Sequence, residues 1–152
     1  MARPLICFAM MTSPKTTKPS DYPVLCVKGS SVSVCNTEAD FARATPHALR
    51  SGWFDGLLVV DSSGYAWTVS HAEKVEGHSG RLFAGLFAPR VVTIRCVYED
   101  APKQISLQEV QELLCRAFEG DPNHWEAYAS LDQLKTDVRN TQSLSELFKL
   151  MA

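Results

Sequence analysis

The feature that most constrains the fold is a series of three helix-start motifs in the C-terminal third. Ser106-x-x-Glu109, Ser130-x-x-Gln133 and Ser143-x-x-Glu146 each match a capping box, in which the serine caps the N3 amide and the Glu or Gln reaches back to the serine amide. Apolar residues follow at helical spacing: Leu107, Val110, Leu114, Ala117 and Phe118, then Leu131, Leu134 and Val138, then Leu144, Leu147, Phe148 and Met151. The motifs therefore predict three amphipathic helices.

The first half of the sequence instead has the two-residue period of β-strands. Tyr22 to Cys35 predicts two strands, broken at Gly29-Ser30-Ser31. Thr37, followed by acids, predicts an N-capped helix after the second strand. Two β-rich runs flank Asp61-Ser62-Ser63-Gly64, where Asp accepts backbone hydrogen bonds and Gly supplies a positive φ. We interpret Asp61 as a turn residue and not as a catalytic acid.

Together these patterns predict an α+β fold. We expect a largely antiparallel sheet of about five strands, with one helix after the second strand and a C-terminal set of three helices packed on one face. Residues 21–152 form a single domain in this interpretation. We interpret residues 1–20 as a disordered tail or as a mis-assigned start, with Met10 or Met11 the true first residue.

Charge and composition exclude several functional classes. The 15 Lys and Arg against 17 Asp and Glu argue against nucleic-acid binding, and no run approaches the ~20 apolar residues of a membrane span. Glycine-rich phosphate-binding patterns and the common hydrolase motifs are absent. The five cysteines form no C-x-x-C pair, which favours a reducing, cytoplasmic location.

Three groups of residues in the sequence are candidates for chemistry, and each also has a possible structural role. His71, Glu73 and His78 are the best metal ligands, although two histidines in a loop are commonly solvated. Cys35 lies just ahead of the Thr37 cap, where a thiolate is favoured. Asp55 and Asp61 bracket one strand and are candidates for a pair of carboxylates. We nevertheless predict no catalytic residue, no metal and no cofactor.

Aromatic and acidic residues provide the stronger signal, for protein binding. Residues 37–80 carry six acids and three bases, which suits a basic partner. Trp67 is expected in the core, whereas Trp53 and Trp125 are open between core and surface. The predicted partner-binding residues are Trp53, Asp55, Glu73, Glu76, His78 and Trp125.

In its short α+β chain, mild acidity and serine-capped helices the sequence resembles small bacterial immunity proteins, which bind and neutralise a toxin. No motif specific to that class is present, so the resemblance assigns no residue. The leading hypothesis is a non-enzymatic, cytosolic protein-binding module, such as an immunity protein or inhibitor. The alternatives are a small thiol or metal-assisted hydrolase with its site assembled from distant residues, and a structural subunit of a homo-oligomer.

Overall fold

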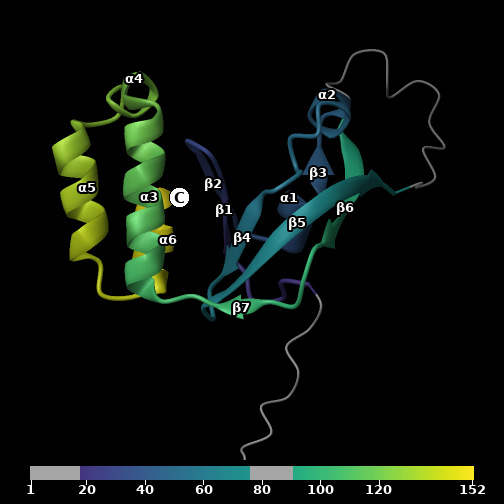
Figure 1. Ribbon diagram of the computed structural model, residues 1–152, viewed down its shortest axis with the longest axis horizontal. Coiled ribbons are helices and arrows are strands. Elements are labelled where there is room, and N and C mark those ends of the chain that lie inside the picture. The colour runs from purple at the N-terminus through teal and green to yellow at the C-terminus, as the bar shows by residue number, and fades with distance from the viewer. Residues whose placement is uncertain (1–17, 76–90) are drawn as a thin grey trace, which may run out of the picture.

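The computed structural model describes residues 18–75 and 91–152, which form an α+β fold built on a curled antiparallel sheet (Figure 1). The strands are β1 (Val24–Lys28), β2 (Ser31–Cys35), β3 (Arg43–Ala44), β4 (Leu58–Asp61), β5 (Tyr65–Lys74), β6 (Val92–Tyr98) and β7 (Lys103–Gln104). The helices are α1 (Glu38–Phe41), α2 (Pro46–Arg50), α3 (Leu107–Gly120), α4 (Pro122–Trp125), α5 (Leu131–Asn140) and α6 (Leu144–Met151). The predicted fold class is confirmed.

The sheet has the strand order β2-β1-β4-β5-β6-β3, and β7 pairs with β5. Every pairing is antiparallel. β1 is central to one half of the sheet, because Val24 pairs with Cys35 of β2 on one side and with Asp61 of β4 on the other. Its first four residues are all buried, so helices or curled strands must cover both faces of the sheet.

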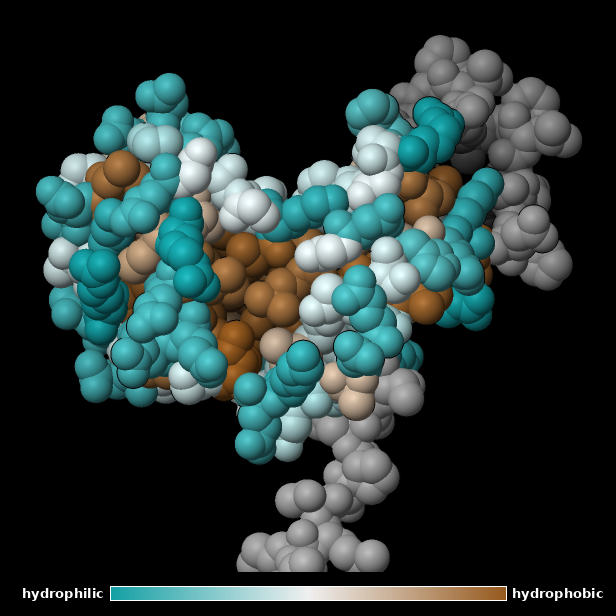
Figure 2. Space-filling view, in the orientation of Figure 1, coloured by the Kyte–Doolittle hydropathy of each residue, from teal (hydrophilic) through white to brown (hydrophobic). Residues whose placement is uncertain are grey.

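Two apolar clusters cover these two faces. Leu25 and Val27 face α3, α5 and α6 in the first cluster, which we call the helix-side core. Val24 and Cys26 point the other way into the second, the strand-side core, which α1, the turn after α2 and β6 complete. Trp67 is only 1% exposed, as predicted for a core residue. In the space-filling view, polar side chains cover the outer helix surface and apolar ones gather in the hollow between helices and sheet (Figure 2).

The Asp61 turn has the predicted structure. Asp61 is fully buried, and its Oδ1 accepts hydrogen bonds from the backbone N–H groups of Ser63 (3.1 Å) and Tyr65 (3.0 Å) and from Ser63 Oγ (2.9 Å). Gly64 adopts φ of +89°, a conformation that glycine reaches without strain. Asp61 therefore holds the β4–β5 hairpin, and no cleft exposes it as an acid.

The three serine caps form, but only one capping box is complete. Ser106 and Glu109 exchange both hydrogen bonds at the start of α3. Ser130 and Ser143 cap α5 and α6 through their side chains. The return bonds differ, however. The Gln133 side chain donates to Asp137 one turn later, and the Glu146 carboxylate accepts from the N–H of Gln142, one residue before the expected partner.

The structure also contains short elements that the sequence did not predict. β3 and β7 have two residues each, too few to show a period, and they raise the strand count of the described residues to seven. Residues 1–17 and 76–90 lie outside the described ranges, and with them most of the predicted N-terminal tail. Lys18, within that predicted tail, pairs with Glu38 of α1 at 2.7 Å. In residues 18–75 and 91–152, no helix has the length and apolar character that a membrane crossing requires.

Candidate functional site

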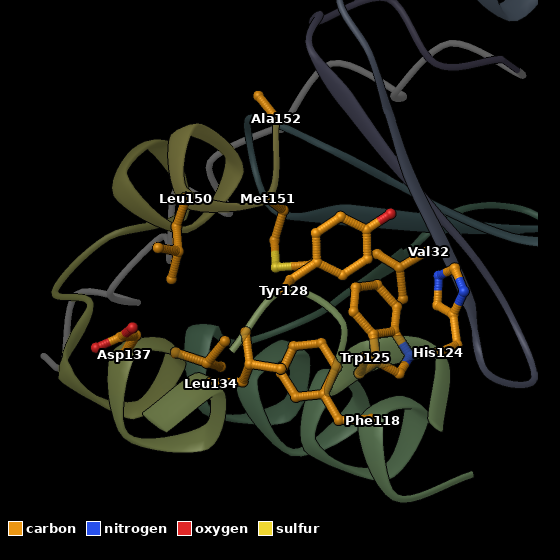
Figure 3. A pocket seen from close by; sticks show the side chains of 11 residues that line it. Val32, Phe118, His124, Trp125, Tyr128, Leu134, Asp137, Leu150, Met151 and Ala152 are labelled. Carbon is orange, nitrogen blue, oxygen red and sulfur yellow. The ribbon is translucent and has the colours of Figure 1, made fainter. Parts of the chain in front are cut away.

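The best-formed candidate site is a cavity of about 310 Å³ between the C-terminal helices and the edge of the sheet. We call it the aromatic pocket. Its lining consists mainly of apolar and aromatic side chains (Figure 3): Val32, Phe118, His124, Trp125, Tyr128, Leu134, Asp137, Val138, Leu150, Met151 and Ala152. The cavity forms because α3 ends at Gly120 and α4 starts at Pro122 in a new direction. α4 and the turn after it then line one side of the cavity, and α5 and α6 line the other.

Aromatic rings define one wall of the aromatic pocket. Trp125 is only 8% exposed; its ring meets Phe118 edge-on at 4.8 Å, and its Nε1 donates to the Ser30 carbonyl at 3.2 Å. Trp125 thus forms the floor of the pocket. The Tyr128 ring lies above it, with 6.2 Å between the two ring centroids, and Tyr128 is 72% exposed. Trp and Tyr are the aromatic residues most enriched at protein-binding hot spots.

The segment that builds this wall is acidic. Residues 119–137 contain five acids, Glu119, Asp121, Glu126, Asp132 and Asp137, against one base, Lys135. Lys135 is already paired with Glu119, and this pairing lowers the pKa of the Glu119 carboxyl. Four of the five acids are exposed, and Asp137 is half-buried in the pocket lining. Asp137 lies in the pocket lining, and Asp121 and Glu126 stand at the two ends of α4. We call these three acids the acidic rim, because they give this side of the pocket a net negative charge.

The acid and base side chains of the aromatic pocket lie far from one another. Its imidazole, on His124, and its carboxylate, on Asp137, lie at opposite ends of the cavity (Figure 3). A nucleophile, a base and an orienting group within hydrogen-bond reach would be needed for general acid–base or covalent catalysis. A cavity of this size and apolar lining instead suits one large aliphatic or aromatic side chain.

The predicted partner-binding residues that the structure describes do not form one surface. Trp125 is buried in the helix-side core, whereas Trp53 packs against the strand-side core on the opposite face of the sheet. Trp125, which the sequence left open between core and surface, lies in the core, because α4 turns its ring onto Phe118. Tyr128, three residues later, is the exposed aromatic. The partner-binding role of the six residues remains a prediction.

The other predicted positions fall near β5 and the turn before β4. Trp53 is half-buried and meets Phe54 edge-on at 5.0 Å, and Asp55 is exposed in the same turn. Glu73 on β5 is exposed and lies opposite Arg95 of β6, whose guanidinium donates to it at 2.9 Å. Glu76 and His78 lie outside the described residues.

The structure brings together two of the three predicted metal ligands, His71 and Glu73. His71 Nε2 lies 3.2 Å from Glu73 Oε1, and hydrogen bonds from Arg95 and then His71 lower the pKa of the Glu73 carboxyl. The Glu73 carboxylate is therefore already paired with the guanidinium of Arg95 on the neighbouring strand. The described part of the chain contains no cluster of three metal-binding side chains, and His78 lies beyond it.

The thiol candidate, Cys35, has one activating and one opposing neighbour. A hydrogen bond from the Cys26 thiol lowers the pKa of Cys35, while partial burial and the Asp40 carboxylate oppose ionisation. The same hydrogen bond, together with burial, raises the pKa of Cys26, and burial raises that of Cys96 to about 11. Cys35 is therefore the most readily ionised of these three thiols, although its anionic neighbour does not favour nucleophilic catalysis.

Alkylation by iodoacetamide, followed by mass spectrometry at a series of pH values, should show this difference. We expect Cys35 to react with a midpoint below that of an ordinary cysteine and to react before Cys26 and Cys96. In Cys26→Ala the midpoint of Cys35 should rise, because the hydrogen bond that stabilises its thiolate is lost. Cys96→Ala is the control and should leave it unchanged. An unmoved midpoint in Cys26→Ala would show that the two thiols do not interact.

The sequence contained one signal for the aromatic pocket, the pair Trp125 and Tyr128 between two helix-start motifs. It did not distinguish which aromatic is buried. Comparison of the chain with models of known protein families, with curated proteins and with solved structures gives no match. The geometry of the aromatic pocket is therefore the main guide to function.

Proposed function

We propose that this chain is a non-enzymatic, cytoplasmic protein-binding module that holds a basic protein partner through the aromatic pocket. An immunity protein that neutralises a toxin, or another inhibitor, is the kind of protein that this proposal describes. The observation that carries it is Tyr128, whose ring is 72% exposed above a cavity floored by buried Trp125. Tyrosine is among the residues enriched at protein-binding hot spots, because its ring buries a large area and its hydroxyl can still form a hydrogen bond.

Two further observations support the proposal. The acidic rim would steer a basic partner and raise its association rate. The four cysteines within the described ranges are free thiols, as expected in a reducing compartment. A second exposed apolar residue, Leu150 at 45%, lies on the opposite wall of the cavity, so a side chain that enters would contact both.

The test is affinity capture of the tagged protein from its own host, with quantitative mass spectrometry of the bound proteins. Tyr128→Ala should reduce the recovered partner and weaken its affinity about 30-fold, as expected for removal of a hot-spot aromatic. Binding should also fall as salt increases, because the acidic rim is screened. The measurement is a titration of the purified pair at two salt concentrations.

Glu73→Ala is the matched control, since it removes an exposed side chain from the other predicted surface. We expect it to leave the affinity unchanged. Loss of binding in Glu73→Ala with full binding in Tyr128→Ala would place the partner on the β5–β6 surface and contradict the proposal. A partner that both variants bind as tightly as the parent would contradict both surfaces.

A further inference from the structure

β2 forms one edge of the sheet and borders the aromatic pocket. In the strand order of the described residues it lies at the end, and its strand partner there is β1. An edge strand presents backbone N–H and C=O groups on its outer side, where another strand can pair. β2 has five residues, whereas β3, at the other end of this strand order, has only two.

The sequence of β2 lacks the usual protection of an edge. Its residues, Ser-Val-Ser-Val-Cys, include no charge and no proline, and its register with β1 is continuous over all five pairs, without a bulge. β3, by contrast, is short and carries Arg43. Soluble proteins usually block a regular, uncharged edge strand with charge, proline or a bulge. A strand kept in this form is suited to pairing with a partner.

Val32 connects this edge to the aromatic pocket. It packs against the helix-side core, and it also lines the cavity beside Trp125 and Tyr128. A residue placed opposite Val32 on an added antiparallel strand would point to the same face of the sheet, with Cβ atoms about 5 Å apart. Its side chain would therefore be directed toward the cavity while its backbone pairs with β2.

The acidic residues near the pocket indicate which side chains an added strand should carry. Asp121 and Glu126 are exposed beside α4, and Asp137 lies in the pocket lining. Side chains two residues apart on a strand share one face, so a lysine or arginine at that spacing from the apolar residue would meet this acidic rim. A helical segment of a partner, in contrast, could place a side chain in the cavity but could not pair with the β2 backbone.

We infer that the protein binds an extended segment of its partner by strand addition to β2, with one large apolar side chain of that segment in the aromatic pocket and a lysine or arginine beside it. This inference rests on the proposed function, because it specifies how the partner occupies the same pocket. Main-chain pairing would supply affinity, and the pocket and rim would supply specificity.

The experiment uses a phage-displayed library of random ten-residue peptides, selected on the full-length protein. We expect enrichment of peptides with a large apolar residue and a Lys or Arg two positions away, and at least tenfold weaker binding to Tyr128→Ala. The best peptide is then synthesised with each backbone amide N-methylated in turn. Affinity should fall about tenfold at every second position across four or five residues, because only alternate amides face β2.

The outcomes separate the inference from the proposed function. Peptides that need Tyr128 but tolerate N-methylation, or lose affinity at helical spacing, would overturn strand addition and leave the binding function intact. Failure to select any peptide that needs Tyr128 would overturn both. Sedimentation of the protein alone provides a further check. A dimer that the selected peptide dissociates would show that a second copy of this chain takes the β2 edge, which also overturns the inference.

Discussion

Asp61→Ala is expected to lower the free energy of unfolding by about 2–3 kcal/mol. The substitution removes an oxygen that accepts three hydrogen bonds, from Ser63 N, Ser63 Oγ and Tyr65 N. Leaving a donor unsatisfied costs about 1–3 kcal/mol when it is buried. Ser63 is exposed and can turn to water, whereas Tyr65 is half-buried at the start of β5. Equilibrium unfolding in urea measures the difference.

The matched variant is Asp61→Asn, which keeps the accepting oxygen and removes the charge. We expect a clearly smaller loss of stability than in Asp61→Ala, because the turn hydrogen bonds can re-form. Ser63→Ala removes one of the three donors and should cost less still, since that hydroxyl is at the surface. Equal stability of Asp61→Ala and the parent protein would contradict the turn role and reopen the interpretation of Asp61 as a functional acid.

The sequence predicted the helices and the main hairpins because their signals are local. A serine cap and its N3 amide are three residues apart, and all three caps form as expected. The return bonds were predicted less well. They depend on where a flexible Gln or Glu side chain finds its best partner, and Glu146 finds the N–H of Gln142. Local propensity determines where a helix starts, but it does not determine which rotamer a side chain adopts there.

The aromatic pocket was not predicted, because it depends on how separate helices pack. Phe118, Leu134 and Met151 come from three helices, and no spacing in the sequence states the distance between those helices. α4 has only four residues, too few for a periodic stripe to show which side of Trp125 faces inward. The same limit applies to β2. Its residues predict a strand, but its position at the edge follows from the pairing order of the whole sheet.

Trp125→Ala is expected to have a larger effect on stability than Asp61→Ala, about 3–5 kcal/mol, because a buried tryptophan truncated to alanine leaves a large cavity. The ring contacts Phe118 at 4.8 Å and His124 at 5.0 Å, and its Nε1 bond to Ser30 ties α4 to the β1–β2 turn. Loss of the ring therefore loosens both the floor of the aromatic pocket and the strand that borders it. Chemical denaturation measures the change in stability.

Trp125→Phe separates the two contributions of this residue. Phenylalanine keeps an aromatic ring against Phe118 but cannot donate to Ser30, so the expected cost is about 1–2 kcal/mol. The affinity for the partner should fall less in Trp125→Phe than in Tyr128→Ala, since Trp125 is 8% exposed and Tyr128 72%. If Trp125→Ala unfolds like the parent protein yet loses the partner, Trp125 contacts the partner directly. Trp125, and not Tyr128, would then be the main anchor for the partner, because a side chain whose truncation leaves stability unchanged cannot be part of the core.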